Sequence, residues 1–187
     1  MNPNDNFISP GSSLPGQGSD KKFFTIIGLV VALVLIVGAG LLLLGGGQSA
    51  QDQLNQLSVQ LTDLKNLTSE SSDNLRQEAS LNFNGELQLT LASDQASLSK
   101  DLGLGAPDDK TLQAQADTQA AAKLASSATN GSYDQTYKQI VTQKLSAITA
   151  QASEIYQSTN SQPIKQSMES VYEHFTELNQ RLSDIKL

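Results

Sequence analysis

The residues best suited to chemistry surround the single histidine of this 187-residue chain, His174. Glu169, Glu173 and Glu177 recur at a spacing of four, so a helix would carry them as one acidic stripe beside the imidazole. Such a stripe could hold a cation weakly. A carboxylate-bridged di-metal site in a helical bundle, however, typically uses Glu-x-x-His pairs on two facing helices, and the residue three before His174 is Val171. We therefore interpret the stripe as a solvated face. We predict no metal site and no cofactor, with His174, Glu173 and Glu177 as weak metal candidates only.

Catalytic motifs are equally sparse. Residues 97–100 (SLSK) match the S-x-x-K nucleophile motif of penicillin-recognising enzymes, but the chain has no S-D-N or K-T-G partner. A Ser-His-Asp triad would have to use His174, and no G-x-S-x-G elbow presents a serine. The chain contains no cysteine, which excludes thiolate zinc sites and iron–sulfur ligation. We predict that the protein is not an enzyme and has no catalytic residue.

The charge balance also limits the possible partners. After residue 47 the chain carries 17 Asp and Glu against 10 Lys and Arg, so nearly all of the net charge of -7 lies there. A surface of this sign repels phosphate backbones, whose binding needs clustered Lys and Arg. We predict no nucleic-acid partner.

Residues 23–44 form an uncharged segment of 22 residues, FFTIIGLVVALVLIVGAGLLLL. A helix of that length covers about 33 Å, which matches the roughly 30 Å of a bilayer's hydrocarbon core. The apolar part of a signal peptide is usually only about 7 to 15 residues long. We therefore predict a retained transmembrane helix over 23–45 that contacts the lipid bilayer. Cleavage among the small residues of 46–50 is the alternative.

The flanks of this segment predict its orientation. Lys21 and Lys22 precede it, whereas the next positive residue after it is Lys65. The positive-inside rule then predicts a cytoplasmic N-terminus and an extracytoplasmic domain over 46–187 of a single-pass protein in the cell membrane. Residues 1–22 are rich in Pro, Gly, Ser and Asn, a composition typical of a disordered tail.

The elements that must position the candidate residues are predicted to be helices. Ala, Gln, Ser, Leu and Thr dominate after residue 47, and apolar residues recur at helical spacing over 54–67, 75–102, 112–124, 133–155 and 164–185. We predict an all-α fold, an antiparallel bundle with an additional N-terminal helix near the membrane. Gly103 and Gly131 are expected to end helices, Asp108 to cap one, and Ser132 and Gln135 to form a capping box.

Residues 80–91 fit two structures. Their apolar residues lie at helical spacing, but several also alternate around Asn84–Gly85, a strong hairpin signal. We predict a helix, because a lone two-stranded hairpin is only marginally stable and no other strand-like segment is present to pair with it. The four tyrosines are interpreted as packing residues at or near helix cores: Tyr133, Tyr137, Tyr156 and Tyr172.

Four short motifs occur in one order, at 102–107 (LGLGAP), 133–137 (YDQTY), 147–148 (AI) and 173–175 (EHF). They resemble the motifs of a ferritin-like family of exported bacterial proteins of unknown function, over about residues 70–186. The resemblance implies a four-helix fold and a bacterial, exported setting. The family's further histidines would fall around Asp94–Gln95 and Gln143–Lys144, where this chain has none, so only His174 carries over.

These observations favour a membrane-anchored extracytoplasmic helical bundle with a binding or structural role at the bacterial cell envelope. Its expected partner is an unknown envelope protein or a second copy of the chain. Two alternatives stay open, a metal-binding ferritin-like protein with a reduced ligand set and a sensory ligand-binding bundle. A sensor would need a route back through the membrane, and no second apolar span follows residue 44.

Overall fold

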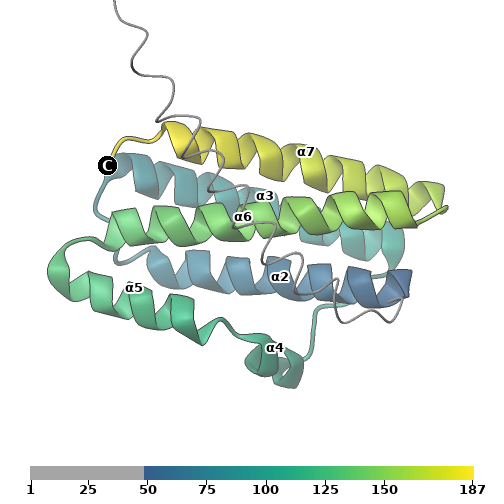
Figure 1. The fold of residues 1–187 in the computed structure, drawn as a ribbon, viewed down its shortest axis with the longest axis horizontal. Helices are drawn as coiled ribbons and strands as arrows, with labels where there is room; N and C mark the ends of the chain where they lie inside the picture. The colour runs from purple at the N-terminus through teal and green to yellow at the C-terminus, as the bar shows by residue number, and fades with distance from the viewer. Residues whose placement is uncertain (1–48) are drawn as a thin grey trace, which may run out of the picture. The chain divides into compact units, whose positions relative to one another are not determined.

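The computed structural model describes residues 49–187, which form helices and no strand (Figure 1). The helices are α2 (Ala50–Ser71), α3 (Glu78–Leu102), α4 (Asp109–Gln115), α5 (Thr118–Asn130), α6 (Tyr133–Ser158) and α7 (Gln162–Asp184). The all-α prediction is confirmed for this part, and residues 80–91 are helical as predicted. None of the helices in residues 49–187 is long and apolar enough to cross a membrane. The predicted tail and anchor, at 1–22 and 23–45, lie outside the described residues.

Four long helices make the bundle, in which α2 packs on α3 and α6, and α7 packs on the same two helices. Contacts between α2 and α6 join opposite ends of the two helices. Gln53 accepts from Gln151 at 3.3 Å near one end, and Ser71 accepts from Tyr133 at 3.1 Å near the other. The pairing of α3 with α7 is antiparallel too, because Glu86 contacts Arg181 while residue 94 of α3 meets residue 174 of α7. The antiparallel helical bundle is therefore confirmed.

One long crossover connects the two halves of the bundle. The halves are the hairpins α2–α3 and α6–α7, and the chain between them passes through α4 and α5 along the outside of α2 and α6 (Figure 1). Two sequence predictions were wrong here. The segment 54–67 is a full member of the bundle rather than an additional helix, since Leu57 and Leu64 are completely buried. The segment 112–124 is not one helix but is divided between α4 and α5.

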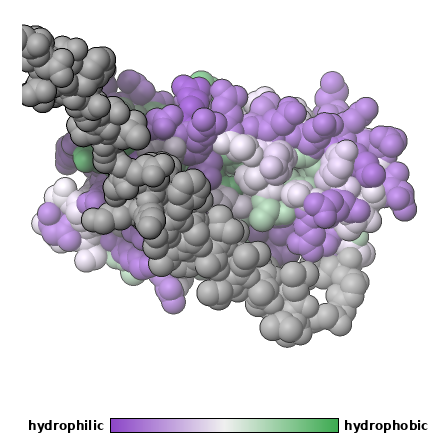
Figure 2. Space-filling model, turned by 45° about the horizontal axis from the view of Figure 1, so that its top comes forward, coloured by the Kyte–Doolittle hydropathy of each residue, from purple (hydrophilic) through white to green (hydrophobic). Residues whose placement is uncertain are grey.

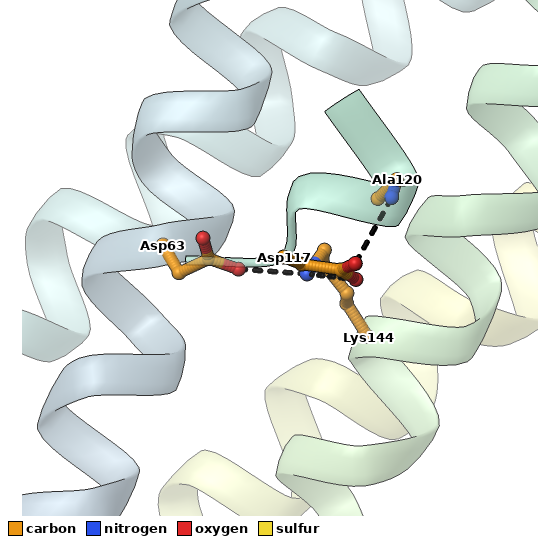
Figure 3. Close-up of polar contacts among 4 residues, drawn as sticks. All are labelled: Asp63, Asp117, Ala120 and Lys144. Carbon is orange, nitrogen blue, oxygen red and sulfur yellow. Dashed lines mark hydrogen bonds and ion pairs between the residues drawn. The ribbon is translucent and has the colours of Figure 1, made fainter. Parts of the chain in front are cut away.

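The division falls at Asp117, whose side chain caps α5 by accepting from the Ala120 amide at 2.9 Å. Asp117 also meets Lys144 of α6 at 3.2 Å, and the same ammonium lies 2.7 Å from Asp63 of α2 (Figure 3). Burial raises the pKa of Asp117, but the Ala120 amide and Lys144 outweigh burial and hold it below its ordinary value. The ion pairs of Lys144 with Asp63 and Asp117 hold the start of α5 against α2 and α6, so they position the crossover.

Helix ends follow local chemistry in most places. Gly103 and Gly131 end α3 and α5 at φ of 65° and 77°, the left-handed region that favours glycine. Asp108 caps α4 by accepting from the Thr111 amide at 2.9 Å, as predicted. The capping box predicted for Ser132 is wrong, because its side chain makes no cap bond and its hydroxyl instead donates to Asn130 at 2.6 Å.

The core is built from the apolar stripes of the four long helices, with a smaller contribution from α5 and the connections. The predicted face of α7 is confirmed, and Phe175 at its centre has no exposed surface. Two tyrosines were placed wrongly, since Tyr156 is 40% exposed and Tyr172 is 44% exposed. Tyr133 and Tyr137 are buried as predicted. Other completely buried side chains are Leu87, Leu91, Val141, Leu145, Ala152, Ile155 and Met168.

A polar network lies within this apolar core. Asn84 of α3 accepts from the Tyr137 hydroxyl at 2.6 Å and donates to the Thr68 carbonyl at 3.1 Å and to the Ser72 hydroxyl at 3.0 Å. Gln88 donates to the same two groups at the C-terminal end of α2, each at 3.1 Å. Burial raises the pKa of Tyr137, so its phenol stays protonated and able to donate. These hydrogen bonds thus fix the positions of α2, α3 and α6 relative to one another, whereas apolar packing alone would allow the helices to slide slightly.

Candidate functional site

The candidate site is a carboxylate–imidazole pair on the seam between α3 and α7. Asp94 Oδ1 lies 2.9 Å from His174 Nδ1, within hydrogen-bond distance. The two residues stand midway along their helices, which the antiparallel packing brings side by side. Asp94 is 4% exposed, whereas the His174 side chain is 46% exposed. The pair therefore reaches from the bundle interior to its surface.

Asp94 is the unusual member of the pair. A buried carboxylate needs partners for both oxygens, because losing water without compensation is costly. Oδ1 has His174, but Oδ2 is buried and no group in the described chain donates to it. Burial raises the pKa of Asp94, although the hydrogen bond and charge of His174 lower it in part. One oxygen of Asp94, Oδ1, is thus held by His174, while Oδ2 has no partner in the described chain.

Two hollows flank the pair along the seam. The larger has a volume of about 470 Å³, and its walls come from the second half of α3 and the first half of α7. Asp94 and Asp101 are its charged lining residues, and the rest of the lining is Ser97, Leu98, Pro163, Gln166, Ser167, Ser170 and Val171. The smaller hollow measures about 160 Å³ and is lined by Glu86, Thr90, Ser93, His174, Glu177 and Leu178. Asp94 thus borders one hollow and His174 the other.

The seam is polar and acidic. No Lys, Arg or His side chain lines the larger hollow, and its serines and glutamine offer hydrogen bonds around an apolar patch of Leu98 and Val171. Figure 2 shows hydrophilic side chains over much of the face that it presents, with small hydrophobic areas between them. A ligand suited to the larger hollow would be small and polar and would carry positive charge or N–H donors.

The three metal candidates named from the sequence, His174, Glu173 and Glu177, do not share one site. Glu173 is exposed and lines neither hollow, while Glu177 shares the smaller hollow with His174. Within residues 49–187, no group of three or more acidic or histidine side chains is arranged to hold a metal ion. The only side-chain hydrogen bond of His174 within residues 49–187 is the one with Asp94.

Sequence reasoning found His174 but missed Asp94. A signal was present, because Asp94 continues the buried stripe of Leu87, Leu91 and Leu98 at intervals of three and four. A carboxylate at a core position of an amphipathic helix predicts a buried partner or a ligand. The identity of that partner, 80 residues away, requires the fold.

Comparisons with known proteins leave the chain without an assigned relative. No protein-family model, curated protein or solved structure matches it. The resemblance to a ferritin-like family therefore stays a prediction.

Proposed function

We propose that this chain is a membrane-anchored, extracytoplasmic helical-bundle protein of the bacterial cell envelope that acts by binding. The apolar segment 23–44 and the preceding Lys21 and Lys22 support the anchor and its orientation. The single long crossover between α3 and α6 supports a ferritin-like topology, because ferritin-like bundles have one such connection and up-down-up-down bundles have none.

The proposed binding role rests on one observation. Asp94 has a buried oxygen without a hydrogen-bond donor, and its side chain lines a hollow of about 470 Å³. That volume lies within the range of about 300 to 1,000 Å³ that is usual for small-molecule sites. With Asp94 and Asp101 in the lining and no basic side chain among them, the chemistry that completes the site is a small organic cation. An ammonium group in this hollow would balance the charge of the two lining carboxylates, Asp94 and Asp101.

Isothermal titration of the full chain in detergent tests this role, with putrescine, butyramide and butyrate as probes of similar length and different charge. We expect putrescine alone to bind. Asp94→Asn should weaken its affinity by at least about tenfold, equivalent to ~1.4 kcal/mol. Glu173→Gln is the matched control, because it removes an acidic charge outside both hollows and should leave the affinity unchanged. Undiminished binding in Asp94→Asn, or equal binding of butyramide, would overturn the assignment.

The orientation has its own test. The chain contains no cysteine, so single cysteines report location without background. Cysteine in place of Gln119, an exposed residue of α5, should react with a membrane-impermeant maleimide on intact spheroplasts. Cysteine in place of Ser12 should react only after the cells are lysed. The reverse pattern would contradict an extracytoplasmic bundle.

A further inference from the structure

The turn between α5 and α6 carries one of two Asn–Gly pairs in the sequence, Asn130–Gly131; the other is Asn84–Gly85. Glycine has no side chain to hinder its own amide nitrogen, which can therefore reach the carboxamide carbon of a preceding asparagine. Attack there closes a five-membered ring. Whether an Asn–Gly pair reacts in this way depends on its exposure, its backbone freedom and the bonds that hold the carboxamide.

The exposure of Asn130, its place at the end of a helix and the bonds to its carboxamide favour reaction there. It is exposed at the last position of α5, and Gly131 leaves the helix with a φ of 77°. Asn130 Oδ1 accepts two hydrogen bonds from Ser132, from its backbone amide at 3.0 Å and from its hydroxyl at 2.6 Å. Both donors face the oxygen on which negative charge develops when the carboxamide carbon is attacked. Such an arrangement stabilises the tetrahedral intermediate of acyl transfer.

The opposite conditions hold at Asn84. Its side chain is buried inside α3, where Gly85 belongs to the same helix. Its amide nitrogen, which would have to leave as ammonia, donates to the Thr68 carbonyl and the Ser72 hydroxyl. Reaction there would require the helix to unwind and a buried network to break. The chain thus contains a reactive pair and a protected pair with the same dipeptide sequence.

We infer that Asn130 is a site of intramolecular deamidation, promoted by Ser132. The Gly131 nitrogen forms a bond to Asn130 Cγ, and the Cγ–Nδ2 bond breaks. Ammonia departs, carrying the proton that the Gly131 nitrogen loses. Water then opens the succinimide at either carbonyl, which leaves an aspartyl or an isoaspartyl residue. Both products add one negative charge to the turn, and the isoaspartyl product also lengthens its backbone.

The experiment follows the full chain in detergent at physiological pH and temperature over several days, with tryptic peptides analysed by mass spectrometry. Cleavage after Arg76, Lys100, Lys123 and Lys138 places the two Asn–Gly pairs in separate peptides. We expect the peptide with Asn130 to accumulate the deamidated mass in two chromatographic forms, aspartyl and isoaspartyl, while the peptide with Asn84 keeps its amide. In urea, where the fold no longer protects it, Asn84 should react too.

Two variants test the chemistry. Ser132→Ala removes the hydroxyl donor but keeps the backbone donor, and it should slow deamidation of Asn130 about tenfold, the equivalent of ~1.4 kcal/mol in the barrier. Thr129→Ala, which alters a neighbouring exposed hydroxyl that bonds to the Ser126 carbonyl instead, should not change the rate. An Asn130 peptide as stable as the Asn84 peptide in the folded chain would overturn the site. Equal rates in Ser132→Ala and the parent chain would overturn the part assigned to Ser132.

Discussion

Replacing Phe175 with alanine is expected to lower the free energy of unfolding by about 3 to 5 kcal/mol, the usual range for truncating a buried aromatic side chain. Phe175 has no exposed surface and lies on α7, which packs against both α3 and α6. Backbone and side chains around it belong to several helices, so the cavity cannot close by the movement of one residue. Urea denaturation of residues 48–187, followed by circular dichroism, measures the loss.

Tyr172→Ala is the matched control for this change. Tyr172 precedes Phe175 by one helical turn and is also aromatic, but it is 44% exposed. Its truncation should cost less than about 1 kcal/mol, since exposed substitutions outside special sites have small effects. Equal losses for the two variants, or a loss below about 0.5 kcal/mol for Phe175→Ala, would mean that α7 faces the core differently.

Asn84 and Tyr137 are expected to show strong energetic coupling. Tyr137→Phe leaves Asn84 Oδ1 buried without its donor, and Asn84→Leu leaves the Tyr137 hydroxyl buried without its acceptor. Either single change should cost about 1 to 3 kcal/mol, the desolvation penalty of one unsatisfied buried group. The Thr68 carbonyl and Ser72 hydroxyl keep Gln88 as a donor when Asn84 is replaced. They should therefore add little to the loss.

The double variant decides whether the effect comes from this bond. With both partners apolar, neither leaves an unpaired polar atom behind, so its loss should be smaller than the sum of the two single losses by at least about 0.5 kcal/mol. The measurement is a double-mutant cycle by urea denaturation of residues 48–187. Additive losses would show that the two side chains act independently and that the 2.6 Å contact contributes no stability of its own.

Helical periodicity predicted most of the core because it depends only on neighbours along one helix. It identified the buried faces of α6 and α7, and it favoured a helix over a hairpin for residues 80–91. It failed for Tyr156 and Tyr172, which lie at the edge of an apolar stripe, where burial depends on the adjacent helix. It also failed at Asp117, which divides the expected helix by capping α5 through the nearby Ala120 amide and which also bonds to Lys144 in another helix.

The candidate site was less predictable because it depends on a contact between two helices. His174 could be selected by residue type alone, but the sequence does not show which side chain meets it. Asp94 becomes relevant only after α3 and α7 are packed antiparallel in one particular register. The three carboxylates at a spacing of four beside His174 are exposed, as the interpretation of a solvated face predicted, because residues of one helix at that spacing share one face.

The crossover determines at which ends of the bundle the start of α2 and the C-terminus lie. An up-down-up-down bundle returns its last residue to the end from which it started. Here α2 and α7 run in the same direction, so the start of α2 and the C-terminus lie at opposite ends of the bundle (Figure 1). The 22 residues of α2 place those ends about 33 Å apart along the axis at 1.5 Å per residue. A pull between them would load the α2–α6 and α3–α7 seams lengthwise, in shear, instead of peeling one helix after another from a single end.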